Sequence, residues 1–287
     1  MIHAREADKR GLFHEETPGW SDPAKKPRFL RKGRKEGRGC LPFVELLFKP
    51  LSWSGRKSGV YSSKEWTSVG RTFGGQRNTM KKIGRFHVLT DTCLQTQFSH
   101  LELAKLAIAG GADTIQFRQK SGETREMIRD AEQIQALCKR AGVTFIVNDR
   151  VDVAIASRAD GVHLGQNDFP IPLARKLLGE EVIIGGSAGN MEEARNCLSE
   201  GADYIGFGPV YFTTSKDDAG PASGLDLLKQ VVVEIPLPII AIGGITRENT
   251  PLVIRAGVHG IAVISAVCCQ QDPAEATRCL RHLLEGD

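Results

Sequence analysis

The sequence predicts a (β/α)8 barrel, a closed parallel sheet surrounded by helices, over residues 80–287. Short apolar runs alternate with amphipathic segments throughout these residues, which is the pattern of a parallel sheet covered by helices. Eight such units in 208 residues match the lower end of the size range of this fold. An open doubly wound sheet rarely has eight evenly spaced units, and no GxGxxG motif follows the first predicted strand.

Each predicted strand is a short apolar run bounded by turn residues. In order they are Phe86–Leu89, Thr114–Phe117, Phe145–Val147, Gly161–Leu164, Val182–Ile184, Tyr204–Phe207, Ile239–Ile242 and Gly260–Ile264. Helical periodicity follows each strand, first with the apolar face Leu101, Leu103, Ala104, Leu106 and Ala107, then with Ile128, Ala131, Ile134 and Leu137, and later near Ala154, Leu173, Ala194, Leu227, Val253 and Leu280. The phrases GGAD, RAD, GAD and AGVHG recur before strands, where a Gly or small residue ends a helix.

The composition changes sharply at residue 80. Residues 1–79 contain 17 Lys+Arg and 8 Asp+Glu, a net charge of +9, whereas the other 21 basic and 26 acidic residues give −5. The first part also contains all three tryptophans and little sustained periodicity. Three interpretations stay open for it: an overextended gene start before Met80, a disordered extension, or a basic arm that binds nucleic acid. The overextended start is the favoured interpretation, and the nucleic-acid arm is the least favoured.

The cysteines predict a reducing compartment. Seven are scattered without a C-x-x-C pair, which is typical of free thiols in a cytoplasmic protein. We interpret Cys268 and Cys269 as two small side chains near the start of the last helix. No apolar run reaches the ~18 residues that span a bilayer, and the first residues lack the apolar segment of a secretory signal. No membrane partner is therefore expected.

Two pairs of charged residues follow the first half of the predicted strands. Asp149 and Asp168 each stand just past a strand, nineteen positions apart, so a parallel sheet would bring both to one edge. Two carboxylates there suit a hard divalent cation that carries a phosphate; the alternative is that each caps a helix. Arg118 and Lys120, two apart, predict a grip on phosphate, unless they are solvated loop charges.

Small and hydroxylated residues follow the second half. Ser187 stands in a glycine-rich run and suits either a ligand or a helix N-cap. Thr213, Thr214 and Ser215 precede Lys216 in a polar, anion-friendly loop that suits a lid. The Gly243-Gly244 turn and the Ile264-Ser265 turn fit the phosphate site that this fold builds after its last two strands. His163 lies inside a strand and is expected to be a buried, hydrogen-bonded core residue.

These segments together resemble the thiamine phosphate synthases. The matching segments are QFRQK (116–120), ND (148–149), GVHLGQND (161–168), GADYIGFGPV (201–210), TTSK (213–216), IAIGGI (240–245) and AVISA (262–266). They stand in the family's order and spacing, cover nearly all of residues 84–287, and include none of residues 1–79. The resemblance implies a transferase of thiamine biosynthesis that joins 4-amino-2-methyl-5-hydroxymethylpyrimidine diphosphate to thiazole phosphate and releases diphosphate.

The resemblance also implies roles for individual residues. The pyrimidine diphosphate would be bound by Gln116, Phe117, Arg118, Gln119, Lys120, Asn148, Ser187 and Lys216; Mg²⁺ would be bound by Asp149 and Asp168; and thiazole phosphate would be bound by Thr213, Thr214, Ser215, Gly244, Ile264 and Ser265. No general base is expected. Arg118, Lys120 and Lys216 would instead stabilise the leaving group, so positioning and charge would carry the reaction.

Three positions depart from the family's usual pattern. Gln119 stands where an acid is usual, Ala188-Gly189 where Thr-His often follows the serine, and Phe212 where a proline is usual. A thiazole tautomerase of the same barrel family and a non-catalytic barrel that binds thiazole or thiamine phosphate are the alternatives. Gly189 at the tautomerase's histidine position, with both aspartates present, favours the synthase. The sequence leaves the oligomeric state open and is compatible with a homo-oligomer.

Overall fold

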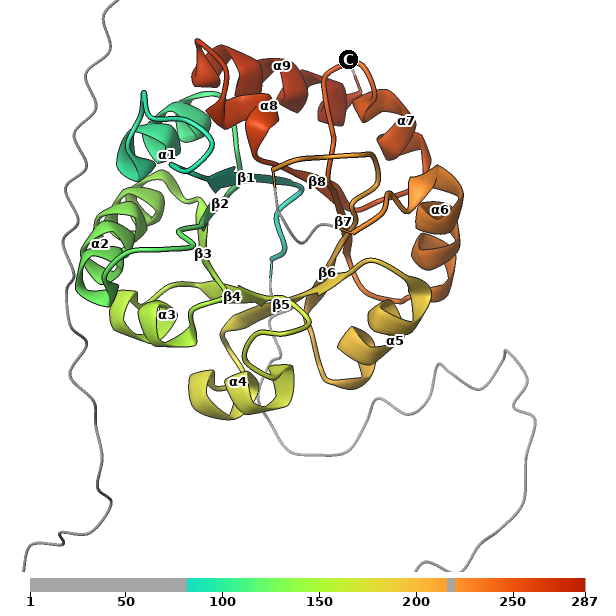
Figure 1. Cartoon of the computed structure of the whole chain (residues 1–287), viewed down its shortest axis with the longest axis horizontal. Helices are drawn as coiled ribbons and strands as arrows, with labels where there is room; N and C mark the ends of the chain where they lie inside the picture. The colour runs from blue at the N-terminus through green and yellow to red at the C-terminus, as the bar shows by residue number, and fades with distance from the viewer. Residues whose placement is uncertain (1–81, 216–219, 287) are drawn as a thin grey trace, which may run out of the picture. The chain divides into compact units, whose positions relative to one another are not determined.

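A computed structural model describes residues 82–215 and 220–286 of the chain. The expectations for residues 1–79 and for Lys216 lie outside these residues. The sheet is a closed barrel of eight parallel strands in sequence order, with β1 paired to β8, which confirms the predicted fold class (Figure 1). The strands are β1 (Phe86–Thr90), β2 (Thr114–Phe117), β3 (Thr144–Asn148), β4 (Gly161–Leu164), β5 (Ile183–Ala188), β6 (Tyr204–Phe207), β7 (Ile239–Ile242) and β8 (Gly260–Val263).

The helices form a ring outside the strands (Figure 1). They are α1 (His100–Ala109), α2 (Thr124–Ala141), α3 (Val151–Ser157), α4 (Ile171–Leu178), α5 (Met191–Ser199), α6 (Gly224–Glu234), α7 (Thr250–Arg255), α8 (Ser265–Cys268) and α9 (Pro273–Glu285). Helix α2 shows how each one packs, because Ala131 and Ile134, as predicted, are fully buried against the sheet. Helix α2 ends at Ala141, and the next residue, Gly142, caps it with a φ of 68°, a left-handed conformation that favours glycine.

Alternation along the strands separates two apolar groups. Side chains such as Val88 and Phe145 point outward and pack with the helices in the main core. Their neighbours point into the barrel, where Leu89, Ile146 and Ile240 form a second cluster with Tyr204. By the same parity, Gln116, Asn148, His163 and Ser187 point inward, where they line a small chamber together with members of that cluster. The barrel interior therefore holds the apolar cluster and these four polar side chains side by side.

Two of the sequence-based boundaries are wrong in an informative way. Strand β5 does not end at Ile184 but continues through Gly185-Gly186-Ser187 to Ala188, since Gly185 and Gly186 pair with both β4 and β6 and the last two residues pair with β6. Cys268 ends the separate short helix α8, and Cys269 follows it, so neither lies near the start of α9 as predicted. Cys268 is buried and its thiol donates to the Leu89 carbonyl, whereas Cys269 is exposed.

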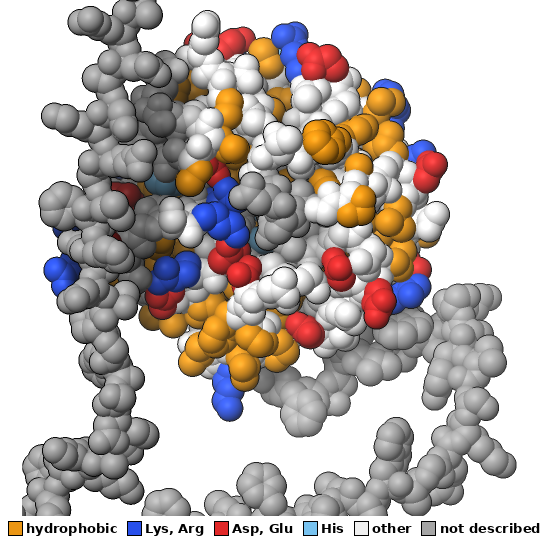
Figure 2. All heavy atoms as spheres, viewed as in Figure 1, with side chains coloured by type: hydrophobic (Ala, Val, Ile, Leu, Met, Phe, Trp, Pro, Cys, Tyr) orange, Lys and Arg blue, Asp and Glu red, His pale blue; other side chains and the backbone are white. Residues whose placement is uncertain are grey.

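A group of apolar side chains lies on the outer surface of α3 and α4. Ile155 is 50% exposed, Leu173 51% and Leu177 60%. Figure 2 shows hydrophobic side chains gathered over α4 at the lower edge of this face. These residues add no packing to the barrel core, which α4 contacts through Ile171 and Ala174. No helix in residues 82–215 or 220–286 has the length and apolar character needed to cross a bilayer.

Candidate active site

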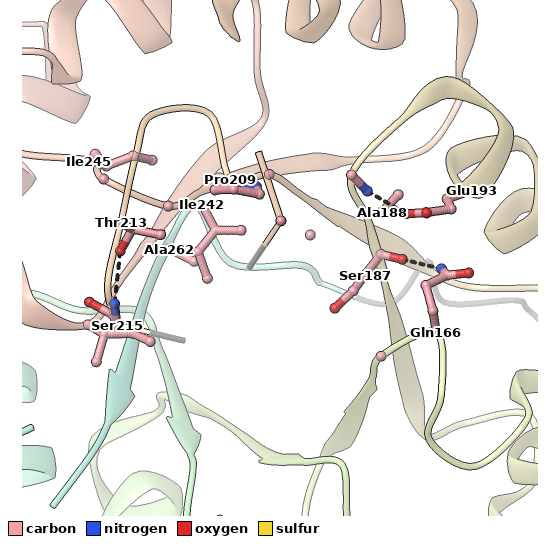
Figure 3. Close-up of a pocket in the computed structure, with 18 of the residues that line it drawn as sticks. Gln166, Ser187, Ala188, Glu193, Pro209, Thr213, Ser215, Ile242, Ile245 and Ala262 are labelled. Atoms are coloured by element: carbon pink, nitrogen blue, oxygen red, sulfur yellow. Dashed lines mark hydrogen bonds between the residues drawn. The ribbon is translucent and has the colours of Figure 1, made fainter. Parts of the chain in front are cut away.

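A cavity of about 500 Å³ opens at the carboxyl ends of the strands. Its walls come from the loops after β2 to β8, as expected for the functional face of this fold. Figure 3 shows Ser187 and Gln166 on one side of this space and Thr213 and Ser215 on the other. Of the residues predicted for the site, those that line it are Lys120, Asp149, Asp168, Ser187, Thr213, Ser215, Gly244, Ile264 and Ser265.

Three charged side chains form a cluster on one wall of the cavity. The Lys120 Nζ lies 2.7 Å from Asp149 Oδ2, and Asp168 Oδ2 accepts a 2.8 Å hydrogen bond from the Gly165 N–H. Asp149 has a φ of 64°, a left-handed conformation that is uncommon for a residue with a side chain. Such conformations are found most often at functional sites. The parity of parallel strands therefore brings Asp149, Asp168 and Lys120 together, as the sequence predicted.

The two carboxyl groups of this cluster influence each other. Burial by itself raises the pKa of Asp149, but the Lys120 ammonium and a hydrogen bond with Asp168 outweigh it and lower the pKa of Asp149 below its ordinary value. The pKa of Asp168 moves the other way, raised by burial, by that hydrogen bond and by the charge of Asp149. Two ionised carboxylates this close repel each other, and a cation placed between them relieves the repulsion.

This donor set fits Mg²⁺ bound with a phosphate. Mg²⁺ is usually held by one or two carboxylates together with substrate phosphate oxygens and waters. Within the described ranges, no group of three or more His, Cys, Asp or Glu side chains could hold a metal. Asp149 and Asp168 therefore provide enough ligands for a cation that brings its phosphate ligands with it, and too few for a metal held by protein alone.

Arg118 is held differently from Lys120. Its guanidinium forms an ion pair with Asp91, at the end of β1; Arg118 is 6% exposed and Asp91 is 1% exposed. Asp91 Oδ1 also accepts hydrogen bonds from the Cys93 and Leu94 N–H groups, at 2.8 and 3.1 Å. Arg118 lines neither this cavity nor the smaller one beneath it. Sequence reasoning missed Asp91, although its position just past the first strand is the signal that identified Asp149.

A small cavity of about 20 Å³, lined by polar and apolar side chains, forms the floor of the site. Gln116, Asn148, Ser187 and His163 all line it, and the Gln116 amide donates a long hydrogen bond of 3.4 Å to Asn148 Oδ1. His163 is 8% exposed and hydrogen-bonded, which confirms the expectation of a buried, satisfied histidine. Three of the residues predicted to bind one ligand thus surround a single chamber.

Two other residues predicted to bind the ligand, Phe117 and Gln119, have side chains that point away from the cavity. The Phe117 ring packs outward in the main core against His100, with the ring centroids 4.8 Å apart. Its side chain is therefore on the far side of the sheet from the cavity, and Phe117 lines neither cavity, contrary to its predicted role. The Gln119 amide donates to the Ser121 carbonyl at 3.0 Å and lines neither cavity.

The opposite wall is built from backbone and hydroxyl groups. Gly244 has a φ of 62°, and a Cβ there would lie 2.5 Å from the Phe212 carbonyl, so the turn requires glycine. Ser215 Oγ lies 3.3 Å from Ser265 Oγ, which connects the β6 loop to the start of α8. Thr213 Oγ1 accepts from the Ser215 N–H at 3.2 Å. Thr214 is exposed and does not line the cavity.

Comparisons with known proteins agree with this geometry. The family model described as "Thiamine monophosphate synthase" matches residues 86–267. The chain belongs to this family. It is 48% identical over 215 residues to the thiamine-phosphate synthase of Salinibacter ruber, covering 75% of this chain and 95% of that protein. It is 51% identical over 198 residues to the thiamine-phosphate synthase of Methanocella arvoryzae, and the match covers 69% of this chain and 93% of that protein.

A solved structure of the same family shows the same fold. The thiamine phosphate pyrophosphorylase from Pyrococcus furiosus superposes with a TM-score of 0.65 at 41% identity, covering 70% of this chain and 95% of that one. The resemblance noted in the sequence is thus confirmed, and the protein is a transferase of thiamine biosynthesis. The relatives favour the synthase over a tautomerase or a non-catalytic barrel.

Proposed function

We propose that the enzyme couples 4-amino-2-methyl-5-hydroxymethylpyrimidine diphosphate to thiazole phosphate, with Mg²⁺, to give thiamine phosphate and diphosphate. One observation carries the proposal: a cavity of about 500 Å³ has a carboxylate-lysine cluster on one wall and a glycine-hydroxyl wall opposite. The first suits a metal-bound diphosphate and the second a monophosphate. Both walls adjoin the floor chamber, where a heterocycle between the two anions would lie.

Charge stabilisation and positioning would perform the chemistry. The bond between the pyrimidine methylene carbon and the diphosphate oxygen breaks, and its electron pair leaves with the diphosphate. The thiazole nitrogen then donates its lone pair to the methylene carbon and forms the new C–N bond. No proton is abstracted, so no general base is needed. Lys120 and Lys216 would offset the growing charge of the diphosphate. Arg118, also predicted for this role, is paired with Asp91 and lines neither cavity, so it would not contact the diphosphate in this arrangement.

Asp149 and Asp168 would hold the Mg²⁺ in this reaction. When bound, the ion supplies positive charge to the departing diphosphate. Lys120 Nζ lies 2.7 Å from Asp149 Oδ2, so it would both steady this carboxylate and place an ammonium group beside the diphosphate. Gly244 and Ser265 would hold the thiazole phosphate on the opposite wall. The polar floor of Gln116, Asn148 and Ser187 would orient the pyrimidine.

The direct test mixes both substrates with Mg²⁺ and measures diphosphate release. We expect release with the parent protein and its loss in Asp149→Ala and Asp168→Ala, each with an unchanged circular dichroism spectrum. Asp152→Ala is the matched control, because Asp152 is exposed on α3 and paired to Arg150 away from the cavity. Full activity in Asp149→Ala and Asp168→Ala would show that the two carboxylates hold no catalytic metal.

The other expectations remain predictions. Cytoplasmic localisation and the absence of a nucleic-acid or membrane partner rest on composition alone. Size-exclusion chromatography with light scattering would decide whether the protein is a homo-oligomer.

A further inference from the structure

Three polar side chains from adjacent strands, two of them buried and the third, Ser187, partly buried, form a hydrogen-bonded chain beneath the cavity. Tyr204 on β6 lies at the bottom, and its Oη is 3.0 Å from His163 Nδ1 on β4. His163 Nε2 is 2.9 Å from Ser187 Oγ on β5. Ser187 lines both the floor chamber and the main cavity, so the chain runs from the apolar interior to the ligand site. Tyr204 is 1% exposed, and solvent does not reach its lower end.

The barrel makes room for this chain with two glycines. A Cβ at Gly185 would lie 2.2 Å from Tyr204 Cζ and 2.5 Å from His163 Nδ1. A Cβ at Gly206 would lie 2.8 Å from His163 Cε1. Neither glycine has a left-handed φ, so the backbone itself does not demand them. They are required by the space that the imidazole and phenol rings occupy, which indicates that the His163 ring is held in one place.

The direction of the hydrogen bonds follows from the tyrosine proton. Burial raises the pKa of Tyr204 well above its ordinary value, so the hydroxyl keeps its proton. A buried hydroxyl proton needs an acceptor. Among the described residues, the one hydrogen-bond partner of Tyr204 Oη is His163 Nδ1. Tyr204 therefore donates to Nδ1, which leaves the imidazole proton on Nε2, and Nε2–H donates to Ser187 Oγ.

The state of Ser187 follows in turn. With its oxygen already accepting from His163, the hydroxyl proton of Ser187 is free to point toward the chamber and the cavity. We propose that Tyr204 and His163 are positioning residues that hold Ser187 as a hydrogen-bond donor to an acceptor atom of the bound pyrimidine diphosphate. This inference rests on the proposed function for the identity of the ligand. The hydrogen-bond direction itself does not depend on any ligand.

The direction can be measured without substrate. In protein labelled with ¹⁵N-histidine, long-range ¹H–¹⁵N spectra distinguish a protonated from an unprotonated ring nitrogen. The His163 signals are assigned by their loss in His163→Gln. We expect the Nε2–H tautomer in the parent protein and a shift toward a mixture of tautomers in Tyr204→Phe, which removes the donor to Nδ1. An Nδ1–H tautomer or an imidazolium in the parent protein would overturn the proposal.

Kinetics then test the effect on the ligand. Tyr204→Phe should raise the KM for the pyrimidine diphosphate by roughly 3- to 10-fold, the worth of one neutral hydrogen bond, and leave the KM for thiazole phosphate unchanged. His163→Leu should have a larger effect, and His163→Gln, whose amide still donates toward Ser187, should recover part of it. Circular dichroism confirms that each variant is folded. Equal changes in both KM values, or none, would contradict the proposal.

The two measurements separate this inference from the proposed function. If the parent protein shows the expected tautomer but releases no diphosphate, the proposed function fails, and the role of Ser187 toward that ligand fails with it. If the parent protein is active but shows the other tautomer, the proposed function stands and the positioning role of Tyr204 and His163 is refuted.

Discussion

Replacement of Asp91 by asparagine should destabilise the barrel by removing the charge that pairs with buried Arg118. Asp91 is 1% exposed and Arg118 6%, so water cannot take the place of the lost carboxylate. Asparagine keeps the side-chain size and an oxygen that accepts from the N–H groups of Cys93 and Leu94, so the change isolates the charge. Breaking a buried pair in this way costs about 3–5 kcal/mol, which lowers the Tm of a domain this size by roughly 6–20 °C.

Urea unfolding followed by circular dichroism measures this loss. The control is Asp152→Asn, because Asp152 is 57% exposed and its pairing with Arg150 should contribute only about 0–1 kcal/mol. The double variant Asp91→Asn/Arg118→Met removes the uncompensated charge and should be more stable than Asp91→Asn alone. The reasoning is refuted if Asp91→Asn unfolds at the same urea concentration as the control, or if the double variant recovers no stability.

Two further predictions concern the same fold. Burial lowers the pKa of His87 and of His100 from 6.5 to about 4, so the unfolded chain takes up these protons first as the pH falls. Stability is therefore complete above about pH 6.5 and should decline toward pH 4, by roughly 3 kcal/mol for each histidine; urea unfolding across this range checks it, and a flat profile would contradict it. Gly260→Ala places a Cβ 2.0 Å from the Arg85 carbonyl where β1 meets β8 and should lower the Tm sharply, whereas Gly189→Ala, with no neighbour nearer than 3.4 Å, should melt like the parent protein. Equal melting temperatures would show that the barrel seam adjusts freely.

The sequence predicted the barrel because strand and helix periods depend on local residues. It failed at β5, where Gly185 and Gly186 lack the apolar side chains that mark a strand. These residues are extended because Gly185 pairs with His163 on one side and with Tyr204 on the other. Pairing of this kind is decided between segments distant in sequence, so no local pattern shows it.

The residues of the candidate site were likewise predictable only in part. Lys120, Asp149 and Asp168 were identifiable because parallel strands end at one edge of a sheet. The partner of Arg118 was missed: the position of Asp91 just past the first strand was a signal for the functional edge, but the pairing itself joins residues 27 apart in sequence. The position of Phe117 did have a signal, because alternation with inward-pointing Gln116 sends its side chain toward the helices.

The environment of His163 on β4 could be predicted from the sequence only in part. The sequence predicted that His163 is buried and hydrogen-bonded, and the structure confirms this. Its partners Tyr204 and Ser187 depend on the register of three neighbouring strands, which the sequence alone does not fix.

The position of the cavity's opening has a consequence for the order in which substrates bind and products leave. Leu89, Ile146, Tyr204 and Ile240 pack together inside the barrel, and the cavity described above opens at the carboxyl ends of the strands. Substrates that react in this cavity would enter through this opening, and products would leave through it. A pyrimidine ring on the polar floor would then be the first to arrive, since a thiazole phosphate bound above would bar its way. Diphosphate and product would have to leave through that opening before the next substrates bind.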